Sequence, residues 1–355
     1  MTAISDVDLT PRDRLLHARR LHWVLGVFAA LTALASLQIG ATDVTLSAVL
    51  GKLMQGEALN QMELVIMLDI RLPRLAIGLM VGAGLAVSGA VMQGLFRNPL
   101  ADPGIVGVSA GAGLGAITAI VLGAMLPTWL GAAAGQHLVA IAAFLGAWGT
   151  TLLLYRVATR HGRTSVATML LAGIALAALA GAISGILIFM ANDQQLRDLT
   201  FWGLGSLAGA SWVKVMTAGP IILLAVGAAL FLGRGLNGLA LGEATAAHIG
   251  IDVQCMKFIA ILAVAAASGA AVAVSGGIGF VGIVVPHLLR LATGPDHRTL
   301  LPNAALLGAS LLVLADMLAR VVIAPAELPI GIVTAVLGAP AFLWILLKRR
   351  GLVET

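Results

Sequence analysis

Long runs of apolar residues recur along the chain and are separated by short polar segments. Each run approaches the roughly 20 residues that an α-helix needs to cross a bilayer. The pattern therefore predicts ten membrane-spanning helices, of which the eighth is short and follows the small residues Ser275, Gly276 and Gly277. Their approximate bounds are 22–40, 75–95, 104–124, 137–156, 166–190, 212–232, 257–275, 278–292, 303–324 and 329–347.

The composition supports this interpretation. Of the 355 residues, 60% are hydrophobic and only 10% are charged, and the mean hydropathy is +1.03. Soluble domains average about 45–50% apolar and about 25% charged residues. A soluble enzyme, a disordered chain and a coiled coil are therefore excluded. Long uninterrupted apolar runs also exclude an outer-membrane barrel, whose strands alternate in polarity. We expect an all-α polytopic membrane protein with a single membrane domain over residues 1–355.

The charge distribution predicts the orientation. The net charge is +5, and most of the 21 Lys and Arg residues fall on one side of the membrane if the N-terminus is cytoplasmic. Because basic residues collect in cytoplasmic loops, both termini are expected inside, with residues 1–21 as a cytoplasmic N-terminal segment. The positive charge then faces anionic lipid, and nucleic acid is not expected as a partner.

Two polar segments are too long to be tight turns. Residues 41–74 are expected outside, with an amphipathic pattern at Leu46, Val49 and Leu50 that predicts a short interfacial helix. Residues 233–256 are expected inside and form the largest cytoplasmic feature.

Glycine pairs four residues apart are frequent, as in Gly78–Gly82, Gly111–Gly115 and Gly181–Gly185. In lipid, such pairs mark helices that approach each other closely. Dense packing within one subunit is the simpler explanation, and a seam between two subunits is the alternative.

Catalytic and energy-coupling motifs are absent from the sequence. There is no G-x-x-x-x-G-K-[ST] phosphate loop, so the chain carries no ATPase site of its own. Cys255 is the only cysteine and the seven histidines show no metal-ligand spacing, so neither a disulfide nor a metal site is expected. Asp316 and Arg320 are spaced to form an ion pair within one helix. Any energy source is therefore expected in another subunit.

Three segments are not explained by membrane insertion alone. Arg71-Leu-Pro-Arg74 suggests an outer docking site for an acidic partner, with contacts to lipid headgroups as the alternative. Residues 96–104 predict a rigid inner turn, placed where a cytoplasmic gate could be. Residues 241–250 predict a short helix ended by Gly250, which could lie in a groove of another protein or on the membrane surface.

Together these segments resemble the FecCD-type permeases, the membrane subunits of ABC importers for vitamin B12, iron-siderophores and haem. The resemblance covers nearly the whole chain and is densest in four stretches. These are 71–113 (RLPRLAIGLMVGAGLAVSGAVMQGLFRNPLADPGIVGVSAGAG), 241–251 (LGEATAAHIGI), 279–302 (GFVGIVVPHLLRLATGPDHRTLLP) and 315–347 (ADMLARVVIAPAELPIGIVTAVLGAPAFLWILL).

The resemblance implies a type II ABC importer permease fold in the bacterial inner membrane. It implies a homodimer of ten-helix subunits, two partner ATPase subunits that bind ATP and Mg²⁺, and a periplasmic substrate-binding protein. Alternating access would move the cargo, and the energy would come from the ATPases. A stand-alone secondary transporter is the alternative from another class.

The family's functional positions map onto this sequence. Docking of the binding protein is implied at Arg71, Arg74 and Arg320, which gives Arg320 a second role beside its pairing with Asp316. The cytoplasmic gate is implied at Asn98 and Leu100 and at Val166 and Ala167, although B12-type relatives carry hydroxyl residues at the second pair, as Thr164 and Ser165 do here two positions earlier. The helix that couples to the ATPase is implied at Gly242, Glu243, Ala247, His248 and Gly250.

The cargo implied is haem, because residues 192–212 most resemble the haem-uptake members. Haem has a flat apolar face and two propionates, and Arg197 could bind a propionate in a bidentate contact. Pairing of Arg197 with Asp193 or Asp198 is the alternative. The apolar wall of the pathway is expected at Phe189, Met190, Phe201 and Trp202. Haem would be the transported substrate, carried by a periplasmic haem-binding protein, and not a resident cofactor; ferric siderophore and vitamin B12 remain alternative cargoes.

Overall fold

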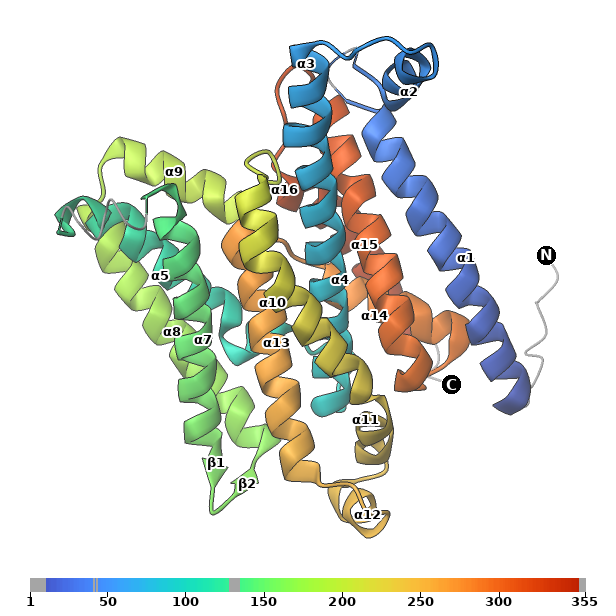
Figure 1. Cartoon of the computed structure of the whole chain (residues 1–355). Coiled ribbons are helices and arrows are strands. Elements are labelled where there is room, and N and C mark those ends of the chain that lie inside the picture. Colours follow the sequence, from blue (N-terminus) through green and yellow to red (C-terminus); the bar gives the residue numbers. More distant parts are fainter. Residues whose placement is uncertain (1–10, 41, 43, 128–134, 351–355) are drawn as a thin grey trace.

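The fold is a bundle of long helices, seen from the side in Figure 1. The computed structural model describes residues 11–40, 42, 44–127 and 135–350. Residues 1–10 of the expected N-terminal segment lie outside these ranges, as do 41, 43, 128–134 and 351–355. In Figure 1, α1 forms one edge of the bundle and α5, α7 and α8 form the opposite edge.

Each of the ten predicted spans corresponds to an apolar helix in the described residues. Eight helical segments are long and apolar enough to cross a membrane, and two shorter apolar helices, Val281–Thr293 and Ile330–Leu343, complete the set. The spanning helices in chain order are α1 (Pro11–Gln38), α4 (Leu72–Leu95) with its N-terminal extension, α5 (Val108–Leu122), α7 (Leu138–Ala158), α8 (Val166–Met190), α10 (Trp212–Phe231), α13 (Val253–Ser275), α14 (Val281–Thr293), α15 (His297–Val321) and α16 (Ile330–Arg350).

The second span begins much earlier than the apolar pattern predicts. A helix runs without interruption through α3 (Gln61–Leu64), the π-helical segment η1 (Val65–Arg71) and α4, giving a span of 35 residues from Gln61 to Leu95. Asn60 and Glu63 start it with a reciprocal capping box. Arg71 and Arg74 therefore lie inside a long helix and not at the edge of a loop.

Short elements occupy the two ends of the bundle (Figure 1). The predicted interfacial helix α2 (Leu46–Met54) is present at the upper end, together with α9 (Asp193–Leu204). The lower end carries α11 (Gly233–Ala240), α12 (Glu243–His248) and a hairpin of β1 (Thr159–Arg160) and β2 (Arg163–Thr164). Positive φ angles at His161 and Gly162 suit the two-residue turn of that hairpin.

The core is formed by α4, α13 and α15, and glycines let these helices approach closely. A Cβ on Gly82 of α4 would overlap the Gly308 carbonyl of α15. On the other side of the bundle, a Cβ on Gly111 or Gly115 of α5 would overlap backbone of α7. Packing within one subunit is thus confirmed for these glycines. Gly181 and Gly185 of α8 differ, because nothing lies within 4 Å of a Cβ built on them.

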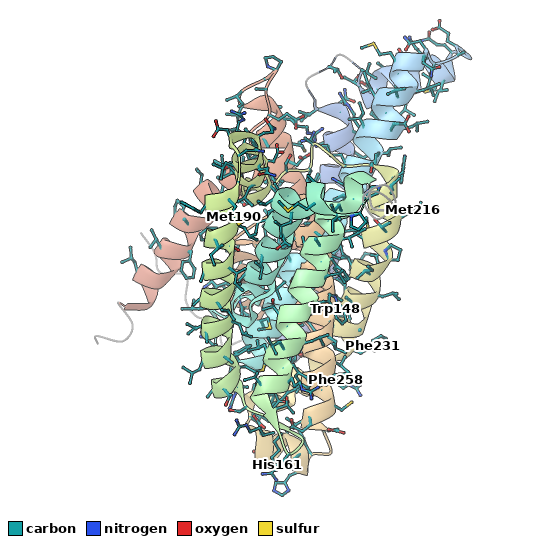
Figure 2. The ribbon with its side chains drawn as sticks, turned by 90° about the vertical axis from the view of Figure 1, so that its left-hand side faces the viewer. Trp148, His161, Met190, Met216, Phe231 and Phe258 are labelled. Atoms are coloured by element: carbon teal, nitrogen blue, oxygen red, sulfur yellow. The ribbon has the colours of Figure 1, made fainter. Side chains whose placement is uncertain are left out.

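The outer surface of the bundle is apolar between its two ends. Figure 2 shows one such face, with His161 at the lower tip and Met190 and Met216 toward the upper end. Met216 and Phe231 of α10 are 68% and 88% exposed on it. A belt of exposed apolar side chains of this kind is what contact with lipid tails requires.

Candidate functional site

The three predicted docking arginines lie together at the upper end of α4 and α15. We call Arg71, Arg74 and Arg320 the outer arginine cluster. Arg74 grips Asp316, with Nη2 and Nε donating to Oδ1 at 2.8 and 3.0 Å. Arg320 Nε lies 3.2 Å from Asp316 Oδ2, which confirms the ion pair expected within α15. The cluster is thus built around one buried carboxylate.

A second carboxylate, which the sequence pattern did not suggest, completes the network. Glu327, in the segment after α15, accepts from Arg74 Nη1 and Nη2 at 2.8 and 2.9 Å. Arg71 donates to the Leu37 carbonyl and to Thr42. All three guanidinium groups are almost fully buried, at 5–7% exposure. In this conformation the cluster therefore holds α1, α4 and α15 together and presents little surface to a partner.

The first pair of predicted gate residues lies in an exposed turn after α4. Asn98 Oδ1 accepts from the Leu100 backbone N–H at 3.0 Å, so the turn is closed by its own side chain. Both residues are exposed, Leu100 by 39%. The turn predicted over residues 96–104 is confirmed, whereas its role as a gate stays a prediction.

The second pair, Val166 and Ala167, forms the first turn of α8, directly after the β1–β2 hairpin. Ala167 is exposed and Val166 is half-buried. The neighbouring hydroxyl groups are already used locally, because Thr164 Oγ1 bonds Thr159 Oγ1 at 2.9 Å and Ser165 Oγ caps α8 at the Thr168 N–H. If Thr164 and Ser165 served as the gate in place of Val166 and Ala167, their hydroxyls would have to give up these local hydrogen bonds.

The predicted coupling helix is α12, at the lowest point of the bundle (Figure 1). Gly242 precedes it with φ +106° and Gly250 follows it with φ +85°, so glycine is required on both sides. Ala246 is buried against α11, whereas Ala247 and His248 are exposed. The end predicted at Gly250 is confirmed, and the helix projects a small-residue surface away from the bundle.

A buried lysine that the sequence analysis missed attaches α12 to the rest of the molecule. Lys257 of α13 is fully buried, and its Nζ lies 2.8 Å from Glu243 Oε1 and 2.8 Å from the Thr164 carbonyl. Thr164 also donates its backbone N–H to Gln254 Oε1 at 2.9 Å. The start of α12 and the start of α8 are thus joined through the first turns of α13.

The predicted pathway residues separate into two groups at the upper end of α8 and α9. Phe189, Met190 and Phe201 are exposed by 91%, 56% and 63%. Arg197 is also exposed, one turn before Phe201 on α9, and donates to the neutral Gln194 amide at 3.2 Å. The alternative that paired Arg197 with Asp193 or Asp198 is wrong, because Asp198 accepts from Gln194 and no ion pair joins Arg197 to either residue in the described structure.

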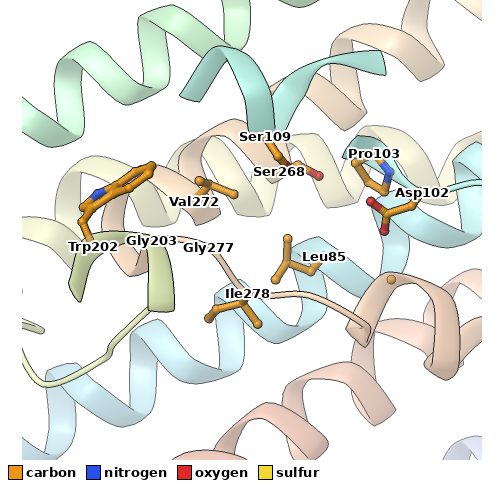
Figure 3. Close-up of a pocket in the computed structure, with 11 residues that line it drawn as sticks. Leu85, Asp102, Pro103, Ser109, Trp202, Gly203, Ser268, Val272, Gly277 and Ile278 are labelled. Carbon is orange, nitrogen blue, oxygen red and sulfur yellow. The ribbon is translucent and has the colours of Figure 1, made fainter. Parts of the chain in front are cut away.

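Trp202 instead lines an internal cavity of about 260 Å³ (Figure 3). The Asp102 carboxyl also faces this cavity, and Ser268 lines it with a buried hydroxyl that has no hydrogen-bond partner. Asp102 Oδ1 accepts from the Gly104 N–H at 2.8 Å, and burial raises the pKa of this carboxyl. The volume of the cavity lies just below the roughly 300–1,000 Å³ of typical ligand sites.

Sequence reasoning thus missed Glu327, Lys257 and Gln254. For Lys257 a signal existed, since a lone lysine at the start of an apolar span requires a partner. No group of three or more His, Cys, Asp or Glu residues that could hold a metal ion occurs among the described residues.

Comparison with known proteins shows which family the chain resembles. Residues 28–348 match the profile of the FecCD transport family. The chain is 48% identical over 285 residues to the hemin transport system permease protein HmuU of Yersinia pestis, covering 80% of this chain and 84% of that protein. It is 46% identical over 285 residues to the vitamin B12 import system permease protein BtuC of Escherichia coli, covering 79% and 83%.

The fold also matches a solved inward-facing structure described as a metal-chelate type ABC transporter. The TM-score is 0.81 at 32% identity, over 93% of this chain and 99% of that chain. With the family match over most of its length and this structural similarity, this chain belongs to the FecCD transport family, as a multi-pass ABC importer permease whose ATPase activity lies in partner subunits.

Proposed function

We propose that the chain moves haem across the bacterial inner membrane as half of a homodimer. Two ATPase subunits, which bind ATP and Mg²⁺, would dock at α12, and a periplasmic haem-binding protein would dock at the upper end. The chain itself holds no cofactor in this proposal. The observation that carries the cargo assignment is the surface at the α8–α9 corner, where Arg197, a cation without a carboxylate partner among the described residues, lies one helical turn from the exposed Phe201.

The chemistry of this surface fits haem. Phe189 and Phe201 offer apolar contact for the flat macrocycle, and the Arg197 guanidinium can bind a propionate through two parallel hydrogen bonds. The 48% identity to the hemin permease HmuU supports the same cargo. The nearly equal identity to BtuC keeps vitamin B12 as a second candidate.

The homodimer is supported by the exposed face of α8. Gly181 and Gly185 form a small-xxx-small pair that no part of the described chain covers, and Leu171, Ile174 and Ile186 are 63–71% exposed. Small residues at this spacing let a second helix approach closely in lipid. Two α8 helices facing each other would enclose a pathway larger than the cavity within one subunit.

Docking of the binding protein is supported by the charge balance of the outer arginine cluster. Three guanidinium groups face two carboxylates there, and within the described residues Arg71 contacts only uncharged oxygens. An acidic side chain from a partner would balance the remaining charge.

The cargo is tested by uptake into proteoliposomes that contain the permease with its ATPase. Binding protein loaded with haem is added outside, with and without ATP, and vitamin B12 or a ferric siderophore on its own binding protein replaces it in parallel. We expect haem uptake that requires ATP. Arg197→Gln should raise the apparent KM for loaded binding protein about tenfold, the loss expected for one charged hydrogen bond. Arg20→Gln, an exposed arginine at the other end of the molecule, is the control.

The competing outcomes are distinct. ATP-dependent uptake of vitamin B12 or siderophore without haem uptake would overturn the cargo and leave the importer. Haem uptake without ATP and without the ATPase would instead indicate a secondary transporter.

The docking role of the outer arginine cluster is tested with a substitution milder than charge reversal. Arg74→Glu would set a new carboxylate beside Asp316 and Glu327 and destabilise the fold. Arg71→Gln removes the charge and leaves a shorter, neutral polar side chain at this position. We expect at least about tenfold weaker binding-protein capture in a pull-down, with unchanged basal ATP hydrolysis. Unchanged capture would remove Arg71 from the docking site.

A further inference from the structure

Thr164 links two parts of the chain that are far apart in sequence. Its backbone N–H donates to Gln254 Oε1 at 2.9 Å, and its carbonyl accepts from Lys257 Nζ at 2.8 Å. Both polar backbone groups of one residue are therefore held by side chains from the first two turns of α13. We call Thr164, Gln254 and Lys257 the Thr164 clasp.

Lys257 extends the clasp to α12. Its side chain is 1% exposed, and its Nζ forms an ion pair with Glu243 Oε1 at 2.8 Å. A buried ammonium is costly unless it is paired and hydrogen-bonded, so both partners of Lys257 are needed to keep it in place. An ammonium has three donors and no acceptor, which suits it to bridge a carboxylate and a carbonyl.

The two partners belong to the two elements that an importer has to coordinate. Glu243 is the first residue of α12, the segment proposed to seat in the ATPase. Thr164 ends the hairpin, and α8 with the predicted gate residues Val166 and Ala167 begins two residues later. A displacement of α12 thus reaches the start of α8 through Lys257, without passing along the 23 residues of α13.

The hairpin is otherwise held mainly by its own bonds. Thr159 and Thr164 pair through their hydroxyls, and the Ser165 N–H donates to the Ala158 carbonyl at 3.0 Å. These contacts join the hairpin to α7 and to itself. Among the hydrogen bonds of the described residues, those of Gln254 and Lys257 connect it to α13.

We propose that Lys257 and Gln254 are positioning residues that transmit movement of the coupling helix to the cytoplasmic start of α8. This proposal rests on the importer function proposed above. The clasp makes α12, the first turns of α13 and the hairpin one mechanical unit, so ATPase closure and gate movement occur together.

The test separates ATPase binding from gate movement. Lys257→Met removes the bonds to Glu243 and to the Thr164 carbonyl and keeps an unbranched buried side chain. Gln254→Leu removes the bond to the Thr164 N–H from a half-buried residue. Lys257→Arg keeps a cation at this position. Lys214→Met, at the upper end of α10, is the matched control. Each variant is assayed for ATPase co-purification, ATP hydrolysis and cargo uptake.

Gate movement is read out with a reporter cysteine. In a Cys255→Ser background the chain has no other cysteine, so Ala167→Cys provides a single thiol at the predicted gate. Its rate of modification by a polar maleimide is measured in the complex with and without a non-hydrolysable ATP analogue. With the clasp intact, we expect the nucleotide to change this rate at least about fivefold, the lower range of typical coupling between sites.

In Lys257→Met and Gln254→Leu we expect the nucleotide effect to disappear and uptake to fall about tenfold. Co-purification and ATP hydrolysis should stay within about twofold of the unsubstituted protein, and Lys257→Arg should recover part of the uptake. If Lys257→Met does not fold, Gln254→Leu alone decides the question.

One negative result would contradict the Thr164 clasp alone, and another would contradict the importer function. A preserved nucleotide effect and preserved uptake in Gln254→Leu and Lys257→Met would overturn the clasp and leave the importer function intact. If the unsubstituted chain captures no ATPase, the proposed function itself fails, and the clasp with it.

Discussion

Asp316 is the residue on which the outer arginine cluster depends, and Asp316→Asn is the sharpest test of that network. Asp316 is 3% exposed and accepts from Arg74 at 2.8–3.1 Å, with Arg320 at 3.2 Å. The substitution keeps the shape of the side chain and removes its charge. Arg74 then keeps only the Glu327 carboxylate, and Arg320 loses its one carboxylate contact in the described structure.

The expected loss in the free energy of unfolding depends on which partners Arg74 and Arg320 keep. Removing one partner of a buried ion pair costs about 3–5 kcal/mol, because the other charge stays buried without compensation. Arg74 keeps Glu327, and Arg320 keeps the Ser36 hydroxyl at 2.9 Å, so we expect the lower limit of about 3 kcal/mol. At about 2 °C for each kcal/mol in a large chain, the midpoint of thermal unfolding should fall by about 6 °C.

The assay is thermal unfolding of the purified protein in lipid nanodiscs. Glu327→Gln is the control, because Glu327 is 33% exposed and its pairing should contribute only about 1 kcal/mol. A double-mutant cycle with Arg74→Met isolates the pair, since Asp316→Asn should cost less once Arg74 is gone. An unchanged midpoint for Asp316→Asn, or the same cost in both backgrounds, would refute the buried network.

Three further predictions concern packing, a buried carboxyl and the lone thiol. Gly82→Ala should destabilise the fold by about 1–3 kcal/mol because its Cβ would meet the Gly308 carbonyl, whereas Gly113→Ala, with nothing within 4 Å, should not; denaturant titration of both compares them. Burial raises the pKa of Asp102 above its ordinary value of 3.8, so this carboxyl binds a proton more tightly in the folded protein than in the unfolded chain. The resulting contribution to the free energy of unfolding is present at low pH and is lost as the pH rises through the folded-state pKa. Asp102→Asn should therefore gain thermal stability relative to Asp102 as the pH is raised from 4 to about 8, and a constant difference across that range would contradict this. Cys255 is exposed at the start of α13, so a maleimide should modify the folded protein at one site without denaturant, which mass spectrometry detects.

The spans could be predicted because the bilayer itself dictates their length and polarity. The start of the second span could not, since it depends on local capping rather than on hydrophobicity. Asn60 and Glu63 satisfy the first backbone N–H groups, and the helix then continues through the polar residues Asp69 and Arg71. A hydropathy pattern treats these charges as a boundary, whereas hydrogen bonding and burial allow the helix to include them.

Contacts within one helix could be predicted from spacing, and contacts between helices could not. Asp316 and Arg320 pair across one turn, and the sequence shows it. Arg74 and Glu327 lie 253 positions apart, and Lys257 lies 93 positions from Thr164. Only the tertiary fold brings them together, so buried charges in a membrane span indicate that a partner exists without indicating which one.

The placement of the predicted functional residues on α4 constrains how the permease can move. The helix from Gln61 to Leu95 is about 52 Å long at 1.5 Å per residue, with the outer arginine cluster near its upper part and the Asn98–Leu100 turn directly after its lower end. Along its length α4 is fixed to α15 twice, by the Arg74–Asp316 ion pair and by the close contact of Gly82 with Gly308. Sliding α4 along α15 would break a buried ion pair and force a glycine contact apart. Because moving both helices as one body preserves both contacts, conformational change is expected at their boundaries with the other helices.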